Sequence, residues 1–230
     1  MASNPQILSD LRVIHEADHQ VELLTTYKGV PFICRAKIEE LTDEHVQLRT
    51  TDECMVCLET DKKPRVLGSD YFEPSVAEVI SIDLHSGLVD LHNLSYVGTK
   101  LGERMIIRVE PENSIPIDLL LDDFNVEGVI ADISLNGIGV RVPVDGYNQT
   151  LKPGTLVNTH FNLPNGKIQL SGIVLSVLKL EYFYRLSIKF EQDGDQKTRI
   201  FHYLVDRRGD IQRELYQLYK QKTMIGTAGE

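Results

Sequence analysis

Short segments of alternating apolar and polar residues, separated by turn residues, run through most of this chain and restrict it to a β-rich fold. In the first part of the chain such segments occupy residues 21–27, 30–38, 45–50, 53–59, 76–84 and 87–92. Lys28 and Gly29 separate the first two segments, as the turn of a β-hairpin would. Short strands that follow one another this closely predict a small barrel or sandwich.

The same pattern returns after a break. Apolar residues become sparse between Leu94 and Gly102, and we interpret this stretch as the connection between two domains, residues 1–97 and 98–230. A length of 230 residues with 42 % hydrophobic residues is enough for two modest cores. Beyond the connection, strand-like segments occupy residues 104–109, 115–121, 126–133, 137–142, 155–162, 167–178 and 182–190.

Two segments have helical spacing instead. Residues 6–17 predict a short amphipathic helix, and apolar residues repeat with a helical period from about 195 to 222. Arg207-Arg208-Gly209-Asp210 is expected to break this tail into two helices. The predicted fold class is therefore mainly β, with two small β-barrel domains and a helical tail at the carboxyl terminus.

Charge narrows the classes of partner. The formal net charge of −10 argues against DNA, RNA or an anionic membrane as the main partner, because affinity for these polyanions comes from Lys and Arg. No apolar run approaches the roughly 18 residues that span a bilayer, and the polar start lacks a signal-peptide pattern, so we expect a cytoplasmic protein without membrane insertion. A small anion in a local basic pocket stays compatible with the charge, since residues 100–108 carry three cations against Glu103.

Two clusters of functional residue types lie in the second domain. Arg104 and Arg108 flank three apolar residues, so on an extended strand they share one face about 13 Å apart, at about 3.3 Å per residue. Arginine pairs with phosphate oxygens or with O6 and N7 of guanine. Asp132, Ser134 and Gly137 follow, and a carboxylate only accepts hydrogen bonds, which suits N1-H and N2-H of guanine. Glycine allows a positive φ or a close approach of the backbone.

Arg104xxxArg108 followed by Asp132xSer134xxGly137 resembles the two-part signature of PilZ domains, which are bacterial receptors for cyclic di-GMP. The resemblance covers residues 99–206 and implies a six-stranded antiparallel barrel. It also implies that the ligand is cyclic di-GMP, without a cofactor or a metal. Ser187 stands where the family commonly has glycine, and Glu103 is an acid at a position that often holds arginine or an apolar residue. Affinity and stoichiometry are therefore open.

The resemblance also implies which residues bind. The expected ligand-binding residues are Lys100, Arg104, Arg108, Asp132, Ser134, Asn136 and Gly137. By analogy with the family, the arginine segment closes over a ligand resting on the barrel, and binding orders residues 97–109 and changes the interdomain arrangement. Such a receptor signals to a protein partner, and a homodimer is a further assembly compatible with the sequence. The other function compatible with the sequence is a PilZ-like interaction scaffold that has lost nucleotide binding.

The first domain resembles, more loosely, the β domain that precedes PilZ in flagellar-brake-like receptors.

Two motifs in the first domain suggest other functions. His15 and His19 match the HExxH pattern of zinc peptidases, but they fall at the end of a short helix with no further ligand in view. Cys54 and Cys57 form a lone CxxC, which we expect in an apolar strand rather than in a zinc or redox site. With no phosphate-loop, GxSxG, GGDEF or EAL motif either, we predict a protein that is not an enzyme and has no catalytic residues.

Overall fold

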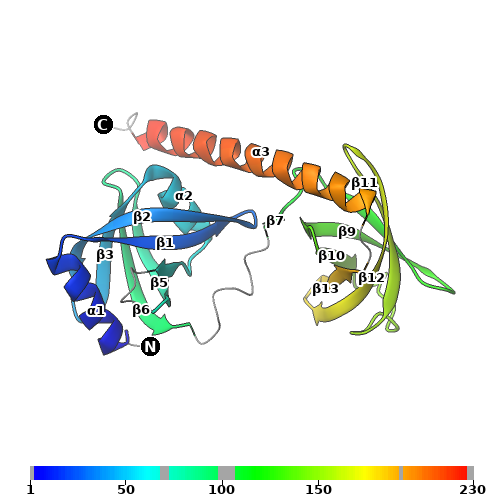
Figure 1. Ribbon diagram of the computed structural model, residues 1–230, viewed down its shortest axis with the longest axis horizontal. Helices are drawn as coiled ribbons and strands as arrows, with labels where there is room; N and C mark the ends of the chain where they lie inside the picture. The colour runs from blue at the N-terminus through cyan, green and yellow to red at the C-terminus, as the bar shows by residue number, and fades with distance from the viewer. Residues whose placement is uncertain (1–2, 68–72, 98–106, 192–193, 227–230) are drawn as a thin grey trace. The chain divides into compact units, whose positions relative to one another are not determined.

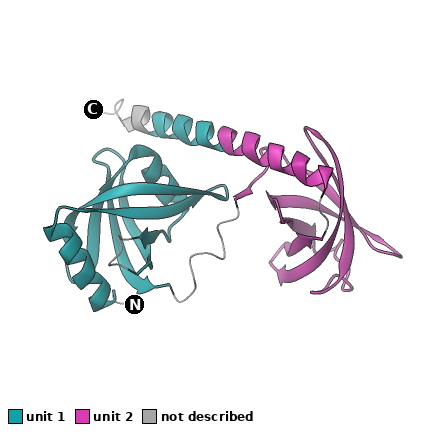
Figure 2. Ribbon diagram, viewed as in Figure 1, with its two compact units in different colours: residues 1–105, 211–230 teal, residues 106–210 magenta. Residues whose placement is uncertain are grey.

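The computed structural model describes residues 3–67, 73–97, 107–191 and 194–226, with side chains up to residue 222 (Figure 1). Contacts divide the chain into two units: residues 1–105 with 211–230, and residues 106–210 (Figure 2). Each unit contains one antiparallel barrel, so the prediction of a mainly β protein with two small barrels is confirmed. The sequence placed residues 211–230 with the second domain, whereas the contacts group them with the first barrel.

The first barrel closes from six strands. They are β1 (Gln20–Tyr27), β2 (Val30–Leu41), β3 (His45–Thr50), β4 (Arg65–Leu67), β5 (Ser75–Asp83) and β6 (Leu88–Tyr96), in the order β1-β2-β3-β6-β5-β4. Lys28 and Gly29 connect β1 to β2 with φ values of 48° and 79°. Positive φ at both central residues is what a tight hairpin turn requires, and the predicted hairpin is therefore present.

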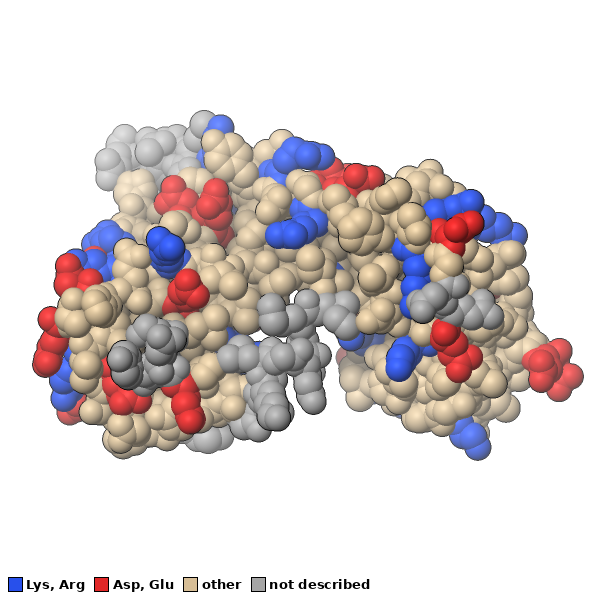
Figure 3. Space-filling model, viewed as in Figure 1, with Lys and Arg blue, Asp and Glu red and all other residues tan. Residues whose placement is uncertain are grey.

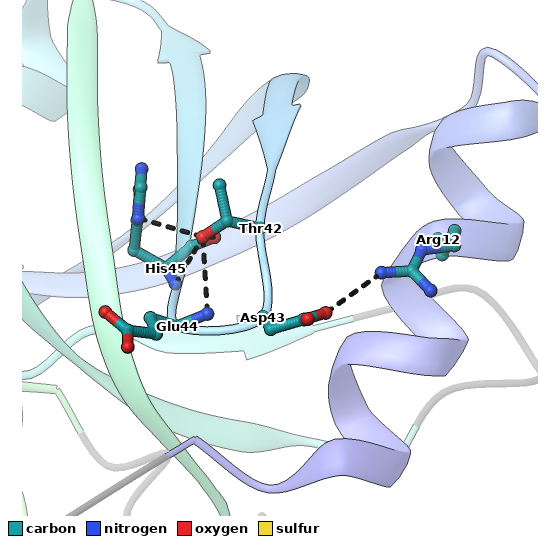
Figure 4. A network of polar contacts seen from close by, with 5 residues as sticks. All are labelled: Arg12, Thr42, Asp43, Glu44 and His45. Atoms are coloured by element: carbon teal, nitrogen blue, oxygen red, sulfur yellow. Dashed lines mark hydrogen bonds and ion pairs between the residues drawn. The ribbon is translucent and has the colours of Figure 1, made fainter.

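Helix α1 (Pro5–Glu16) packs its apolar face on this barrel. The side chain of Asn4 caps the helix by accepting a hydrogen bond from the amide of Gln6, and the buried residues are Ile7, Leu8, Leu11 and Ile14. Figure 4 shows Arg12 reaching Asp43 in the β2–β3 turn, at 3.4 Å between Nη2 and Oδ1. In the same turn, Thr42 Oγ1 accepts from the amides of Glu44 and His45. Burial of the apolar face, rather than the exposed ion pair, holds α1 in place.

The segment predicted as a strand at 53–59 is a helix, so this prediction was wrong. Helix α2 (Asp52–Thr60) buries five successive residues, from Cys54 to Leu58. A short apolar run buried on all sides has no period that separates strand from helix. The acids Asp52 and Glu53 in the first turn favour the helix, because they complement its dipole.

The second unit is built on seven strands. They are β7 (Arg108–Val109), β8 (Pro116–Leu120), β9 (Asn125–Ser134), β10 (Gly137–Pro143), β11 (Leu156–Leu163), β12 (Gly166–Lys179) and β13 (Phe183–Phe190). The sheet order is β10-β13-β12-β11-β8-β9-β7, and an additional pairing of β10 with β9 closes six of the strands into a barrel. The short strand β7 adds to β9 outside this ring.

The tail is one continuous helix, α3 (Asp195–Gly226), so the predicted break at Arg207–Asp210 was wrong. Buried apolar residues continue at helical spacing on both sides of Gly209, at Ile200, Leu204, Ile211 and Leu215. A glycine inside a helix costs only about 1 kcal/mol relative to alanine, which the burial of such residues outweighs. Of the described helix, residues up to Asp210 belong to the second unit and later residues to the first.

Candidate functional site

A β-bulge in β9 decides which side chains reach the outside of the second barrel. Asp132 lies opposite Gly139 on β10 while Ile130 lies opposite Val140, so Ala131 is an extra residue on β9. Ile130 and Ile133 are both buried in the core as a result. Because side chains alternate between the two faces of a strand, Asp132 and Ser134 turn to the outer face, and this is the face that can meet a ligand.

Asp132 holds two arginines on that outer face. Arg185 on β13 donates from Nη2 to Oδ2 of Asp132, and Nη1 of Arg108 lies 3.7 Å from Oδ1. The side chain of Asp132 is 9 % exposed, whereas those of Arg108 and Arg185 are 58 % and 42 % exposed. Two guanidinium groups thus share one carboxylate and keep donors toward solvent, which leaves one net positive charge available for an anion.

Strand pairing places the remaining signature residues beside this ion pair. Arg108 lies directly opposite Ser134 where β7 joins β9. The hydroxyl of Ser134 donates to the carbonyl oxygen of Gly137 at 3.0 Å and so closes the two-residue turn from β9 to β10. The carbonyl of Asn136 in this turn accepts from the amide of Phe190 at 2.9 Å, and the side chain of Asn136 is exposed. The turn is therefore fixed on its barrel side and open on its solvent side.

Two glycines make this arrangement sterically feasible. A Cβ on Gly139 would lie 2.6 Å from Oδ2 of Asp132, so this glycine leaves the room that the carboxylate occupies. A Cβ on Gly137 would lie 2.2 Å from the carbonyl oxygen of Ile188 on β13. Gly137 therefore permits close contact between β10 and β13, which is a different role from the positive φ or the close approach to a ligand that we considered from the sequence.

A pocket of about 220 Å³ opens at the turn. Its lining comprises Arg108, Ser134, Asn136, Gly137, Ile138, Leu175, Ser187, Ile188 and Lys189. Four predicted ligand-binding residues therefore meet in one place, and a fifth, Asp132, adjoins it through Arg108. The predicted residues Lys100 and Arg104 lie outside the described residues. Pockets for drug-sized ligands measure about 300–1,000 Å³, so this one has room for only part of a cyclic dinucleotide.

Comparison with known proteins identifies the domain that carries this pocket. The family described as PilZ domain matches residues 103–206. This chain contains a PilZ domain. An uncharacterized protein of Aquifex aeolicus is 27 % identical over 194 residues, covering 79 % of this chain and 90 % of that protein.

Two solved structures are also similar to this chain. One is the K. pneumonia MrkH–c-di-GMP complex, with 18 % identity and a TM-score of 0.49, covering 91 % of this chain and 95 % of that chain. The other is YcgR from Escherichia coli in complex with c-di-GMP, with 15 % identity and a TM-score of 0.40, covering 100 % of this chain and 96 % of that chain.

Six residues of the PilZ domain line or support the site without having been predicted there: Ile138, Ile188, Leu175, Arg185, Ser187 and Lys189. Arg185, Ser187 and Lys189 alternate along β13 and so share the outer face with Asp132. The alternation of residues 183–190 is visible in the sequence, and it predicts that Arg185, Ser187 and Lys189 lie on the same face of the strand. Ser187, which stands where the family commonly has glycine, lies opposite Gly139 and places a hydroxyl in the pocket.

A larger pocket of about 440 Å³ lies elsewhere in the second unit. It is formed by the segment around Glu112, the β11–β12 turn, and the residues of α3 near Tyr203 and Arg207. The buried Arg207 donates from Nε to the carbonyl oxygen of Glu110 at 2.9 Å, and burial raises the pKa of Tyr203. No residue of the predicted signature lines this pocket.

Charged residues of both signs are interspersed on the face drawn in Figure 3. No helix in the described part of the chain has the length and apolarity needed to span a membrane.

The HExxH segment does not form the helical arrangement that a zinc peptidase uses. Helix α1 ends at Glu16, so His19 lies beyond it. Asp18, between the helix and His19, takes a φ of 54° and pairs with Lys37 at 2.7 Å. Among the described residues, no three His, Cys, Asp or Glu side chains are grouped to hold a metal ion.

The three cysteines are free and buried in the first unit. Desolvation by burial raises the pKa of Cys57 to about 12, and a hydrogen bond with Cys54 raises that of Cys34. The same hydrogen bond lowers the pKa of Cys54, but this residue is fully buried. We expect none of the three thiols to react with N-ethylmaleimide in the native protein at neutral pH, since a reactive cysteine must be both ionised and accessible.

Mass spectrometry after brief labelling checks this expectation. All three cysteines should gain the label once the chain is unfolded in guanidinium chloride, which serves as the positive control. Fast modification of Cys54 or Cys57 in the native protein would instead identify the CxxC as a reactive site.

Proposed function

We propose that this protein is a receptor for cyclic di-GMP, which it binds on the outer face of its PilZ domain. The observation that carries the proposal is the pairing of β7 with β9. This pairing sets Arg108 against Ser134 and beside Asp132, and so joins the two parts of the signature at one pocket. The match of residues 103–206 to the PilZ family supports the same ligand.

Each residue has a role that follows from its chemistry. Arg108 keeps more than half of its side chain exposed, so its fork of donors can take a phosphate or the O6/N7 edge of guanine. Asp132 accepts from N1-H and N2-H of guanine. Ser134 and Asn136 offer polar groups to the guanine edge or ribose, and Lys189 adds a cation to the pocket lining. Arg104 and Lys100 complete the site from the preceding segment in this proposal.

The proposed output is a change in the arrangement of the two domains that a protein partner reads. A ligand held both by the barrel and by residues 97–109 would spend part of its binding energy on ordering that segment, which couples occupancy to shape. Such a receptor performs no reaction on the nucleotide and acts in the cytoplasm. Small-angle scattering curves that coincide with and without nucleotide would contradict this coupling.

Calorimetric titration with cyclic di-GMP tests the receptor. Arg108→Ala is expected to weaken binding about tenfold, because a hydrogen bond to a charged group contributes about 1.5–3 kcal/mol and Arg108 is partly solvated. Arg104→Ala should act in the same direction. Lys152→Ala is the matched control, since it removes one exposed positive charge from a turn of the same barrel, outside the pocket lining.

The same titration decides between the receptor and the scaffold. If the folded wild type binds no cyclic di-GMP at millimolar concentration, the scaffold that has lost nucleotide binding replaces our proposal. The fitted stoichiometry also shows whether Glu103 limits the number of nucleotides bound.

A further inference from the structure

The larger pocket of the second unit, of about 440 Å³, has the size of a small-molecule site. Three segments that are distant in the sequence form it: residues 112–115, residues 162–165 in the β11–β12 turn, and residues 203–210 of α3. We call it the α3 pocket. All three segments belong to the second unit, and none of their residues lines the smaller pocket at which we place cyclic di-GMP.

Tyr203 brings a polar group to the α3 pocket from a buried position. This residue is only 8 % exposed, and it lines the pocket. Within the part of the chain that the structure describes, its hydroxyl has no hydrogen-bond partner. The hydroxyl of a buried tyrosine normally has one. A ligand in the pocket can supply the missing partner.

Three further groups of the pocket accept hydrogen bonds. Glu112 and Asp206 are exposed carboxylates, and neither forms an ion pair or a hydrogen bond with another described residue. Nδ2 of Asn165 donates to the carbonyl oxygen of Arg199 at 2.8 Å, so Oδ1 of Asn165 stays available as an acceptor. Because a carboxylate only accepts, these groups favour a ligand rich in N–H donors.

The charge of the lining favours a cation. Helix α3 contributes four residues at intervals of three or four positions, and hence on one face: Tyr203, Asp206, Arg207 and Asp210. Together with Glu112, the lining holds three carboxylates and one guanidinium, which gives a formal charge of −2. Arg207 is buried, whereas Glu112 and Asp206 are exposed and can meet a cation that enters from solvent.

Apolar side chains complete the lining, at Ile115, Leu163 and Pro164. They suit the hydrocarbon body of an organic cation, whereas they offer no ligand atom to a metal ion. Across residues 3–67, 73–97, 107–191 and 194–226, no three His, Cys, Asp or Glu side chains are grouped to hold a metal ion. The α3 pocket therefore fits an organic cation better than an inorganic one.

We propose that the α3 pocket binds a small organic cation, namely a primary ammonium group on a hydrocarbon body. The ammonium group donates to Glu112, Asp206 and the hydroxyl of Tyr203, and the hydrocarbon packs on Leu163 and Pro164. The second unit then carries two sites of opposite selectivity, one for an anionic nucleotide and one for an amine. The amine site does not depend on the nucleotide site.

NMR titration of the full, isotope-labelled chain with 2-phenylethylamine, without nucleotide and at low salt, tests the proposal. The amine should bind saturably at millimolar concentration and shift the amide signals of residues 112–115, 162–165 and 203–210. The alcohol 2-phenylethanol and the acid 3-phenylpropanoate have nearly the same shape but no positive charge. They should bind at least about tenfold more weakly.

Variants locate the site. Glu112→Gln and Asp206→Asn should each weaken amine binding about fivefold, because a charged hydrogen bond contributes less at an exposed position than at a buried one. Tyr203→Phe keeps the buried ring and should weaken binding about threefold. Asp123→Asn is the matched control, since it removes an exposed carboxylate from the β8–β9 turn, outside the pocket lining, and should leave the affinity unaltered.

Four results would overturn the proposal. They are a titration without saturable shifts, equal binding of the alcohol and the amine, shifts confined to other residues, and an affinity that falls no more in the two carboxylate variants than in Asp123→Asn. The last result would mean that the amine responds only to the net negative charge of the chain. Because no nucleotide is present, these outcomes are independent of cyclic di-GMP binding.

Discussion

Asp132→Ala is expected to weaken cyclic di-GMP binding at least about 100-fold while the PilZ domain stays folded. The carboxylate would accept two N–H groups of guanine, and a good bidentate contact contributes about 1–3 kcal/mol. It also positions Arg108 and Arg185, so its loss should remove part of their contribution too. A total near 3 kcal/mol corresponds to about two orders of magnitude in affinity.

The fold should tolerate Asp132→Ala because both arginines are about half exposed and water can solvate them once the carboxylate is gone. Calorimetry measures the affinity, and circular dichroism verifies the fold. Asp145→Ala, which removes an exposed carboxylate from the turn after β10, should bind like the wild type. An Asp132→Ala protein whose affinity stays within about threefold of wild type would move the guanine site away from this carboxylate.

Gly137→Ala is expected to have the largest effect on stability. The added Cβ would lie 2.2 Å from the carbonyl oxygen of Ile188, and this atom belongs to the backbone of β13 rather than to a mobile side chain. Strands β10 and β13 must then separate. Forcing extra atoms into a packed structure costs about 1–3 kcal/mol and occasionally more, and contact with backbone places this change at or above the upper end. For a chain of this size, about 3 kcal/mol lowers the midpoint of thermal unfolding by roughly 10 °C.

Thermal unfolding followed by circular dichroism measures the effect of Gly137→Ala, and hydrogen exchange shows which barrel loses protection. Gly146→Ala provides the control, since a Cβ there comes no closer than 3.8 Å to its nearest neighbour, the carbonyl oxygen of Pro143. Equal midpoints for the two variants would mean that β10 and β13 can move apart at little cost.

The sequence predicted both barrels well because strand alternation and turn residues are local signals. The hairpin around Lys28 and Gly29 shows this, since the turn follows from two adjacent residues. The prediction of a strand at residues 53–59 failed because the segment from Cys54 to Leu58 is buried on all sides and so has no polar face that would reveal a helical period. Asp52 and Glu53, which favour a helix start, were the available signal. The prediction of a helix break at Gly209 failed because the burial of apolar residues on both sides of it outweighs the weak local preference of glycine against helix.

The site was predictable only in part. The signature predicted that the segment with Arg108 closes over a ligand resting on Asp132 and Ser134, and the strand pairing brings Arg108 next to both residues. Arg185 was missed because it is 53 positions away from Asp132, and only the register of β10 with β13 brings the two together. Register across a barrel depends on bulges and on packing, which no single segment of sequence reveals.

The extra residue in β9 has a consequence for tracing distant relatives. A chain that keeps every letter of the Asp-x-Ser-x-x-Gly run and of the strand before it, but pairs β9 without the bulge at Ala131, would send the aspartate and serine inward and present isoleucine to the solvent. Letter-by-letter matching would accept that chain as a nucleotide receptor. The register of β9 with β10, in which Asp132 lies opposite Gly139 and Ile130 opposite Val140, is what distinguishes the two arrangements.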